Sequence, residues 1–236
     1  MPYSFLPCAS VTELTERAAR FIRQKIAEAQ QADGMCILGL SGGKTPRAVY
    51  EELGIRFWEK IRLFLVDERY VPPDHPESNQ RLVRETLLKN LHLPEEQCVF
   101  PNTVLPIDEC VADYTRRLKN MWKEHLPHLI ILGMGTDGHI ASLFPPLAAV
   151  ALGDEKLVLH TRAPEGIGPP DARDRITLSL NAICAAEEQV LLLQGEEKKR
   201  ALDEMLASPE NERRWPLKQV IATGNLTVIG PATATA

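Results

Sequence analysis

The residues with the clearest chemical potential lie in the segment LGMGTDGHIASLFP, residues 132–145. Three of its glycines have the G-x-G-x-x-G spacing of a dinucleotide-binding loop: Gly133, Gly135 and Gly138. Asp137 and His139 lie on either side of the last glycine. Two chemistries fit this pattern. The glycines could let backbone N–H groups contact a pyrophosphate, or they could form a tight turn that presents a catalytic histidine.

The residues that follow favour the catalytic turn. A nicotinamide fold needs a long helix that opens at the third glycine and an acidic residue at the end of the next strand. Here Pro145 and Pro146 stop a helix within two turns, and the next acidic residues precede an apolar run instead of following it. Histidine, with an unperturbed pKa of about 6.5, suits a general base near neutral pH. We predict that His139 is that base and that Asp137 orients its ring; a hydrogen-bonded structural histidine is the alternative.

A second glycine-rich segment, SGGKTP at residues 41–46, is typical of an anion-binding loop. It is not a Walker A motif, because Gly39 is one residue too close to Gly43 for that spacing. Its glycines would let backbone N–H groups approach an anion at the positive end of the next helix, which Pro46 would begin. An ordinary strand-to-helix turn is the alternative. The predicted phosphate-binding residues of this segment are Ser41, Gly42, Gly43, Lys44 and Thr45.

Charged residues also follow an apolar strand in VDERYVPPDHPESN. Asp67 or Glu68 could act in acid–base chemistry, and Arg69 could bind or polarise an oxyanion. A surface ion-pair group is the alternative. Ser78 and Asn79 are interpreted as the cap of the following helix.

Further basic residues are expected on the same edge of the fold. Arg175 begins the segment RITLSL, and Lys198 lies near the start of a predicted helix, where a solvated helix face is the competing interpretation. Arg162, Arg173, Lys199 and Arg200 are weaker candidates.

Strands and helices alternate along the chain and would position these residues. Ser10 and Glu13 form a capping-box pattern before an amphipathic helix that runs to Gly34. Continuous apolar runs indicate strands near residues 35–40, 61–68, 128–135, 156–161, 175–180, 189–195 and 225–230. Helical spacing is found at residues 78–90, 108–124, 181–188 and 196–207. This alternation predicts an α/β protein with parallel strands, whose ligands bind beyond the carboxyl ends of the strands, where the three polar loops should converge.

Composition limits the class of protein. A chain of 236 residues with 44% hydrophobic residues fits one domain, residues 1–236, better than two. A formal net charge of −5 argues against a nucleic-acid or membrane surface and favours a small-molecule partner. The five cysteines contain no C-x-x-C pair, and no leader or membrane-spanning segment is apparent, so a cytoplasmic location is expected.

The segments SGGKTP, VDERYVPPDHPESN, GMGTDGHIASLFP and PPDARDRITLSL occur in that order, and in this the chain resembles the 6-phosphogluconolactonase family. The resemblance covers most of the chain. It implies a Rossmann-like α/β fold, a mostly parallel twisted sheet with helices on both faces. It also implies hydrolysis of the δ-lactone of 6-phosphogluconate without a metal or a cofactor. Separately, we expect a monomer or a weak homodimer.

The resemblance also implies roles for individual residues. The loop of Ser41, with Thr45, would be the phosphate cradle, helped by Arg175 and Lys198. Asp67 and Arg69 would lie beside the sugar ring, and His139 would be the general base.

Two related functions are alternatives. Glucosamine-6-phosphate deaminases, to which this family is related, continue from the histidine into a segment with a carboxylate for ring opening, but Phe144 stands at that position here. A sugar-phosphate sensor domain is the non-enzymatic alternative, although no DNA-binding helix pair or basic segment is apparent. The ending NLTVIGPATATA departs from the family pattern, and its small residues suggest a frayed tail.

Overall fold

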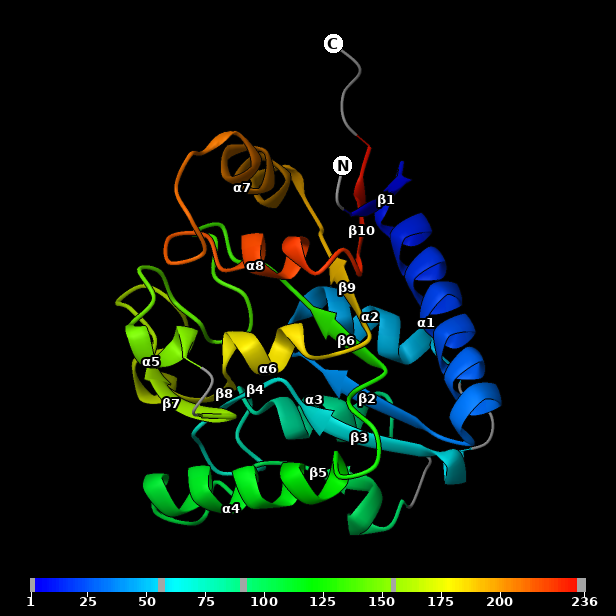
Figure 1. Cartoon of the computed structure of the whole chain (residues 1–236), viewed down its shortest axis with the longest axis vertical. Coiled ribbons are helices and arrows are strands. Elements are labelled where there is room, and N and C mark those ends of the chain that lie inside the picture. Colours follow the sequence, from blue (N-terminus) through cyan, green and yellow to red (C-terminus); the bar gives the residue numbers. More distant parts are fainter. Residues whose placement is uncertain (1–2, 55–57, 90–92, 154–155, 233–236) are drawn as a thin grey trace.

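The fold is built on a parallel sheet, seen in a computed structural model that describes residues 3–54, 58–89, 93–153 and 156–232 (Figure 1). The order of its seven strands is β1-β10-β9-β6-β2-β3-β5, and every neighbouring pair is parallel. The strands are β1 (Ser4–Cys8), β2 (Cys36–Leu40), β3 (Ile61–Leu65), β5 (Cys98–Val99), β6 (Leu129–Leu132), β9 (Glu188–Leu192) and β10 (Leu226–Pro231). The prediction of a mostly parallel α/β sheet is confirmed.

Helices cover both faces of this sheet because successive side chains of each buried strand point to opposite faces. Within β2, Leu38 packs on one face and Ile37 on the other. The helices on the face of Leu38 are α1 (Val11–Asp33), α2 (Lys44–Glu52) and α3 (Asn79–Glu85). Those on the face of Ile37 are α4 (Ile107–Met121), α6 (Leu180–Cys184), α7 (Glu196–Ala207) and α8 (Leu217–Ala222). A short helix, α5 (Ala149–Leu152), lies near α6.

The first helix has the ends that its sequence predicts. The Ser10 hydroxyl accepts a hydrogen bond from the Glu13 N–H at 3.1 Å, and the Glu13 carboxylate accepts one from the Ala9 N–H at 2.7 Å. Gly34 ends the helix in the left-handed conformation, with φ of 74°. Capping and amphipathic spacing therefore determine α1 locally.

A second sheet, of three antiparallel strands, corrects the expectation that every strand belongs to one parallel sheet with alternating helices. Its order is β4 (Asp67–Arg69), β8 (Asp174–Leu178) and β7 (Val158–Arg162), so the segments predicted at residues 156–161 and 175–180 lie outside the parallel sheet. The predicted strand at residues 61–68 divides between the two sheets at Val66. Its N–H donates to Leu40 of β2 at 2.9 Å, and its carbonyl accepts from Leu178 of β8 at 2.9 Å.

Several boundaries also differ from the sequence-based expectation. Pro46 is the third residue of α2 and not the first. The strands β1 and β5 and the helix α8 were not predicted. β5 and α8 have only two and six residues, too few for a clear pattern, and β1 is a partly exposed edge strand that contains Pro7. Of the predicted frayed tail, residues 233–236 lie outside the described residues. In the part of the chain that is described, no helix is both long and apolar enough to span a membrane.

Candidate active site

Three loops converge on a cleft of about 200 Å³ at the carboxyl ends of the central strands, as the sequence predicts. They follow β2, β3 and β6, and Lys198 near the start of α7 also lines the cleft. The cleft is lined by Ser41, Gly42, Gly43, Asp67, Arg69, Asn79, Gly133, Met134, Gly135, His139, Ala141 and Lys198. Seven of the predicted site residues are therefore brought together: Ser41, Gly42, Gly43, Asp67, Arg69, His139 and Lys198.

His139 lines the cleft and forms a close pair with Asp137, which does not line it. The Nδ1 atom of His139 lies 2.6 Å from the Asp137 Oδ1 atom. Partial burial of Asp137 opposes ionisation, but the hydrogen bond and charge of His139 outweigh it, so the pKa of Asp137 is lowered. A proton on Nδ1 that faces a carboxylate leaves Nε2 as the ring nitrogen that can accept a proton. The Phe144 ring packs against the imidazole, with centroids 4.8 Å apart.

The glycines of this turn make room for the pair. A Cβ atom on Gly135 would lie 2.3 Å from the His139 Nδ1 atom and 2.4 Å from the Asp137 carboxylate. Gly138 has φ of +90°, which favours glycine. No helix occurs at residues 133–148, so even the short helix expected before the prolines is absent. A dinucleotide-binding loop would need a long helix here, so the structure disfavours that alternative.

Asp67 is held beside the cleft by a residue of the same turn. Its side chain is nearly buried, and its Oδ2 atom accepts a hydrogen bond from the Ser142 hydroxyl at 2.7 Å. Ser142 lies in the turn of His139, so this bond ties β4 to that turn. Arg69 donates to the main-chain oxygen of Glu77, whose carboxylate lies 3.6 Å from the guanidinium.

Glu68 has a structural role. Its carboxylate is fully buried and accepts hydrogen bonds from the N–H groups of Arg69, Asn79 and Gln80 and from the Ser78 hydroxyl. Burial raises the pKa of Glu68 to about 7, against the lowering effect of these hydrogen bonds. The side chain thus caps the start of α3 and does not line the cleft. Ser78 is the N-cap of α3, as predicted.

In the glycine loop, residues 41–45, the backbone is more available to a ligand than the hydroxyl groups are. The Ser41 hydroxyl donates to the main-chain oxygen of Ile131 at 2.8 Å, and the Thr45 hydroxyl donates to the Gln194 side chain at 2.8 Å. Both hydroxyl protons are therefore used within the protein. Lys44 is exposed, and neither Lys44 nor Thr45 lines the cleft.

Of two further predicted basic residues, Lys198 lines the cleft and Arg175 does not. Lys198 lines the cleft, and burial lowers the pKa of its ammonium group. Arg175 lies opposite Arg69 across β4 and β8, so both side chains lie on one face of the small sheet. Burial, and then the charge of Arg69, lower the pKa of Arg175, and its Nη1 atom is buried without a hydrogen-bond partner among the described residues.

The weaker basic candidates lie elsewhere. Arg162 and Arg200 are exposed, Lys199 pairs with Asp203, and Arg173 donates to the main-chain oxygen of Ala163. None of the four lines the cleft.

Asn79 is a cleft residue that the sequence analysis missed by assigning it only to a helix cap. Its Nδ2 atom donates to the main-chain oxygen of Asp67 at 2.8 Å, and its Oδ1 atom is buried without a partner among the described residues. A Cβ atom on Gly42 would lie 1.8 Å from that oxygen. Asn79 therefore packs the glycine loop against β4. The SN pair alone could not distinguish this role from capping.

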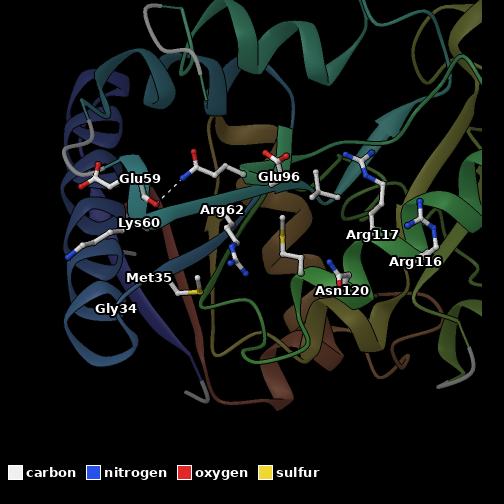
Figure 2. Close-up of a pocket in the computed structure, with 12 residues that line it drawn as sticks. Gly34, Met35, Glu59, Lys60, Arg62, Glu96, Arg116, Arg117 and Asn120 are labelled. Carbon is white, nitrogen blue, oxygen red and sulfur yellow. Dashed lines mark hydrogen bonds between the residues drawn. The ribbon is translucent and has the colours of Figure 1, made fainter. Parts of the chain in front are cut away.

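A larger cavity, of about 540 Å³, lies at the opposite edge of the sheet and does not contain this chemistry (Figure 2). It opens beside Met35, Arg62 and Asn120, at the amino ends of β2 and β3 and the end of α4. Both cations and carboxylates line it, and no histidine is among the described lining residues. The smaller cleft is the candidate active site, because a histidine, an arginine and the glycine loop meet there.

One group of possible metal ligands, Asp33, His125 and His128, also lies away from the cleft. The Nδ1 atom of His128 accepts a hydrogen bond from the Ile37 N–H at 2.9 Å, so Nε2 carries the proton that faces Asp33 at 3.2 Å. A metal ion at Nε2 would have to displace that proton. The geometry therefore fits a hydrogen-bonded cluster better than a metal centre.

Comparison with known proteins places the chain in a family. A family model described as "Glucosamine-6-phosphate isomerases/6-phosphogluconolactonase" matches residues 9–229. The chain belongs to this family.

Several similar proteins are named 6-phosphogluconolactonases. A probable 6-phosphogluconolactonase from Dictyostelium discoideum is 35% identical over 219 residues, which cover 90% of this chain and 91% of the relative. The 6-phosphogluconolactonase of Synechocystis is 34% identical over 90% of this chain and 89% of the relative. The structure of the Plasmodium vivax 6-phosphogluconolactonase superimposes with a TM-score of 0.87 and 29% identity, over 100% of this chain and 92% of that one.

Proposed function

We propose that the chain is a carboxylic ester hydrolase that converts 6-phospho-D-glucono-1,5-lactone to 6-phospho-D-gluconate in the oxidative pentose phosphate pathway. Relatives that cover nine-tenths of the chain are named for this activity. The observation that carries the proposal is the His139–Asp137 pair at a cleft that also holds a backbone loop for an anion.

In the proposed mechanism, His139 activates a water molecule. Its Nε2 atom removes a proton as the water oxygen bonds to the lactone carbonyl carbon, and Asp137 stabilises the imidazolium that forms. The tetrahedral oxyanion is stabilised by Arg69 or by loop N–H groups. The bond from the carbonyl carbon to the ring oxygen then breaks, and that oxygen takes the proton from His139. The product acid loses a proton to solvent, so no cofactor is required.

The phosphate group would bind where backbone N–H groups and cations meet. Gly42 and Gly43 lie at the start of α2, and Lys198 lines the same cleft. Arg175 adds a positive charge whose Nη1 atom has no described partner. Because Thr45 already donates to Gln194, we assign the phosphate contacts of this loop to its backbone in preference to its hydroxyls. Binding the phosphate far from the carbonyl orients the lactone for attack.

A deaminase remains the second enzymatic candidate, and one contact disfavours it. Phe144 packs its ring on His139 at the position where ring opening would need a carboxylate. A sensor domain is the non-catalytic candidate. We also expect a cytoplasmic enzyme that acts as a monomer or weak homodimer, and the five free cysteines fit a reducing compartment.

The test is proton release from freshly generated 6-phosphoglucono-δ-lactone, measured against spontaneous hydrolysis. We expect the chain to exceed the spontaneous rate by several orders of magnitude. Failure to exceed it would reject the proposal. Ammonia release from glucosamine 6-phosphate would favour the deaminase, and saturable binding without turnover would favour the sensor.

A further inference from the structure

The loop that connects α7 to α8 packs directly against the turn of the general base. The Arg214 Nη1 atom donates a hydrogen bond to the main-chain oxygen of Asp137 at 3.0 Å. The residue before Arg214 also contacts this segment, because the main-chain oxygen of Arg213 accepts a hydrogen bond from the Leu147 N–H at 2.8 Å. Two adjacent residues of this loop therefore hold both ends of the segment 137–147.

Trp215 supports the middle of the turn. Its side chain is 2% exposed, and the Arg214 guanidinium stacks 3.7 Å from the centre of its indole. A Cβ atom on Gly138 would lie 2.5 Å from the indole, so the backbone of the turn rests on this ring. Neither side chain lines the cleft.

The charge of Arg214 has no acidic partner among the described residues, although the chain is acidic overall. A half-buried guanidinium usually pairs with a carboxylate. Here the Arg214 guanidinium instead contacts an aromatic ring and a carbonyl oxygen, and this arrangement needs an explanation. The carbonyl belongs to Asp137, the residue whose carboxylate orients His139.

We infer that Arg214 is a positioning residue of the reaction, which acts through Asp137 and His139 and touches no substrate. With the Asp137 carbonyl bonded to Arg214 and Gly138 supported by Trp215, the backbone between carboxylate and imidazole keeps one conformation. That conformation sets the short Nδ1 contact, and through it the direction of Nε2. The inference rests on the proposed role of His139 as the base.

The test compares Arg214→Ala with Arg213→Ala. The neighbouring Arg213 is exposed and uses only its backbone here, so its variant is the matched control. We expect Arg214→Ala to lower kcat about 10- to 100-fold, with KM within about two-fold, because small displacements of a catalytic group are costly. Arg214→Lys should recover part of the loss, since lysine can donate to the carbonyl but cannot stack as a plane. Arg213→Ala should behave as wild type.

A second measurement separates positioning from stability. In the substrate-free protein, NMR of the His139 Nδ1 proton reports the hydrogen bond to Asp137. We expect this resonance to shift and its solvent exchange to quicken in Arg214→Ala, well below the melting temperature, and to stay unchanged in Arg213→Ala. Unchanged kcat in Arg214→Ala, or a lower kcat with an unchanged His139 resonance, would overturn the inference.

The two proposals can fail separately. If wild type does not hydrolyse the lactone, the proposed function is lost. The Nδ1 resonance still decides whether Arg214 positions the pair, because it needs no substrate.

Discussion

Among single residues, His139 is the one on which the proposed chemistry depends most. Replacing it with alanine removes the proton acceptor but leaves the cleft, so we expect kcat to fall about 10²- to 10⁴-fold with little change in KM. Proton release from the fresh lactone measures this. A variant as active as wild type would assign the base to another group.

Replacing Asp137 should lower kcat less than replacing His139 does, and it should change stability in a way that depends on pH. Because its folded pKa is lowered, the carboxylate adds stability at pH values above its ordinary range, and this is lost as pH falls through the lowered value. Asp137→Asn should therefore be less stable than wild type near neutral pH and approach it in strong acid. It should also reduce kcat less than His139→Ala does. Thermal melts of both proteins from neutral to acidic pH test the expectation about stability. A difference in stability between wild type and variant that is the same at every pH would contradict it.

Gly135 and Gly133 form a matched pair of glycines in the same turn. Gly135→Ala would place a methyl group 2.3 Å from the His139 ring, whereas Gly133→Ala would meet nothing within 4 Å. We expect the first to lower kcat about 10- to 100-fold by displacing the ring. Because Gly133 lines the cleft, the second change can alter KM, but it should leave kcat nearly unchanged. Steady-state kinetics with a circular dichroism check of folding makes the comparison. Equal kinetics in the two variants would show that the close approach does not matter.

At the scale of elements, Glu68 joins the small sheet to α3. Each of its carboxylate oxygens accepts two hydrogen bonds, and a glutamine would turn an N–H₂ group toward two donors. Glu68→Gln should therefore cost about 1–3 kcal/mol of unfolding free energy. Chemical denaturation measures this, with the exposed Glu52→Gln as control.

The Glu68 carboxyl should also make the stability of the protein depend on pH. Its folded pKa of about 7 lies above the ordinary 4.5, so its contribution makes stability fall as pH rises between these values. Glu68→Gln should lack this slope. A slope retained in the variant would mean that another group titrates there.

Elements with a strong local signal were predictable from sequence. The capping box of α1 and the apolar run of β2 are read from neighbouring residues, and both occur where expected. The segments that became β7 and β8 also contain apolar residues, but their partners are β4 and each other. Strand pairing depends on residues far apart in the chain, so apolar character could not assign them to a sheet.

For the whole molecule, we propose one folding unit over residues 1–236. One cluster of buried side chains joins the two sheets, with Ile130 and Ile176 as members from each. Calorimetry should show one unfolding transition, with calorimetric and van't Hoff enthalpies that agree. Two separable transitions would show that the small sheet unfolds independently.

The sequence by itself determined the α/β class, the glycine turns and the types of residue at the carboxyl ends of the strands, because caps, apolar runs and turn residues act over a few positions. It also allowed His139 to be chosen as the base. Only the tertiary structure decided that Asn79 lines the cleft, that Glu68 is a buried cap, and that Arg214 and Trp215 support the turn. Each of these contacts joins distant segments, and their geometry follows from packing around a common core.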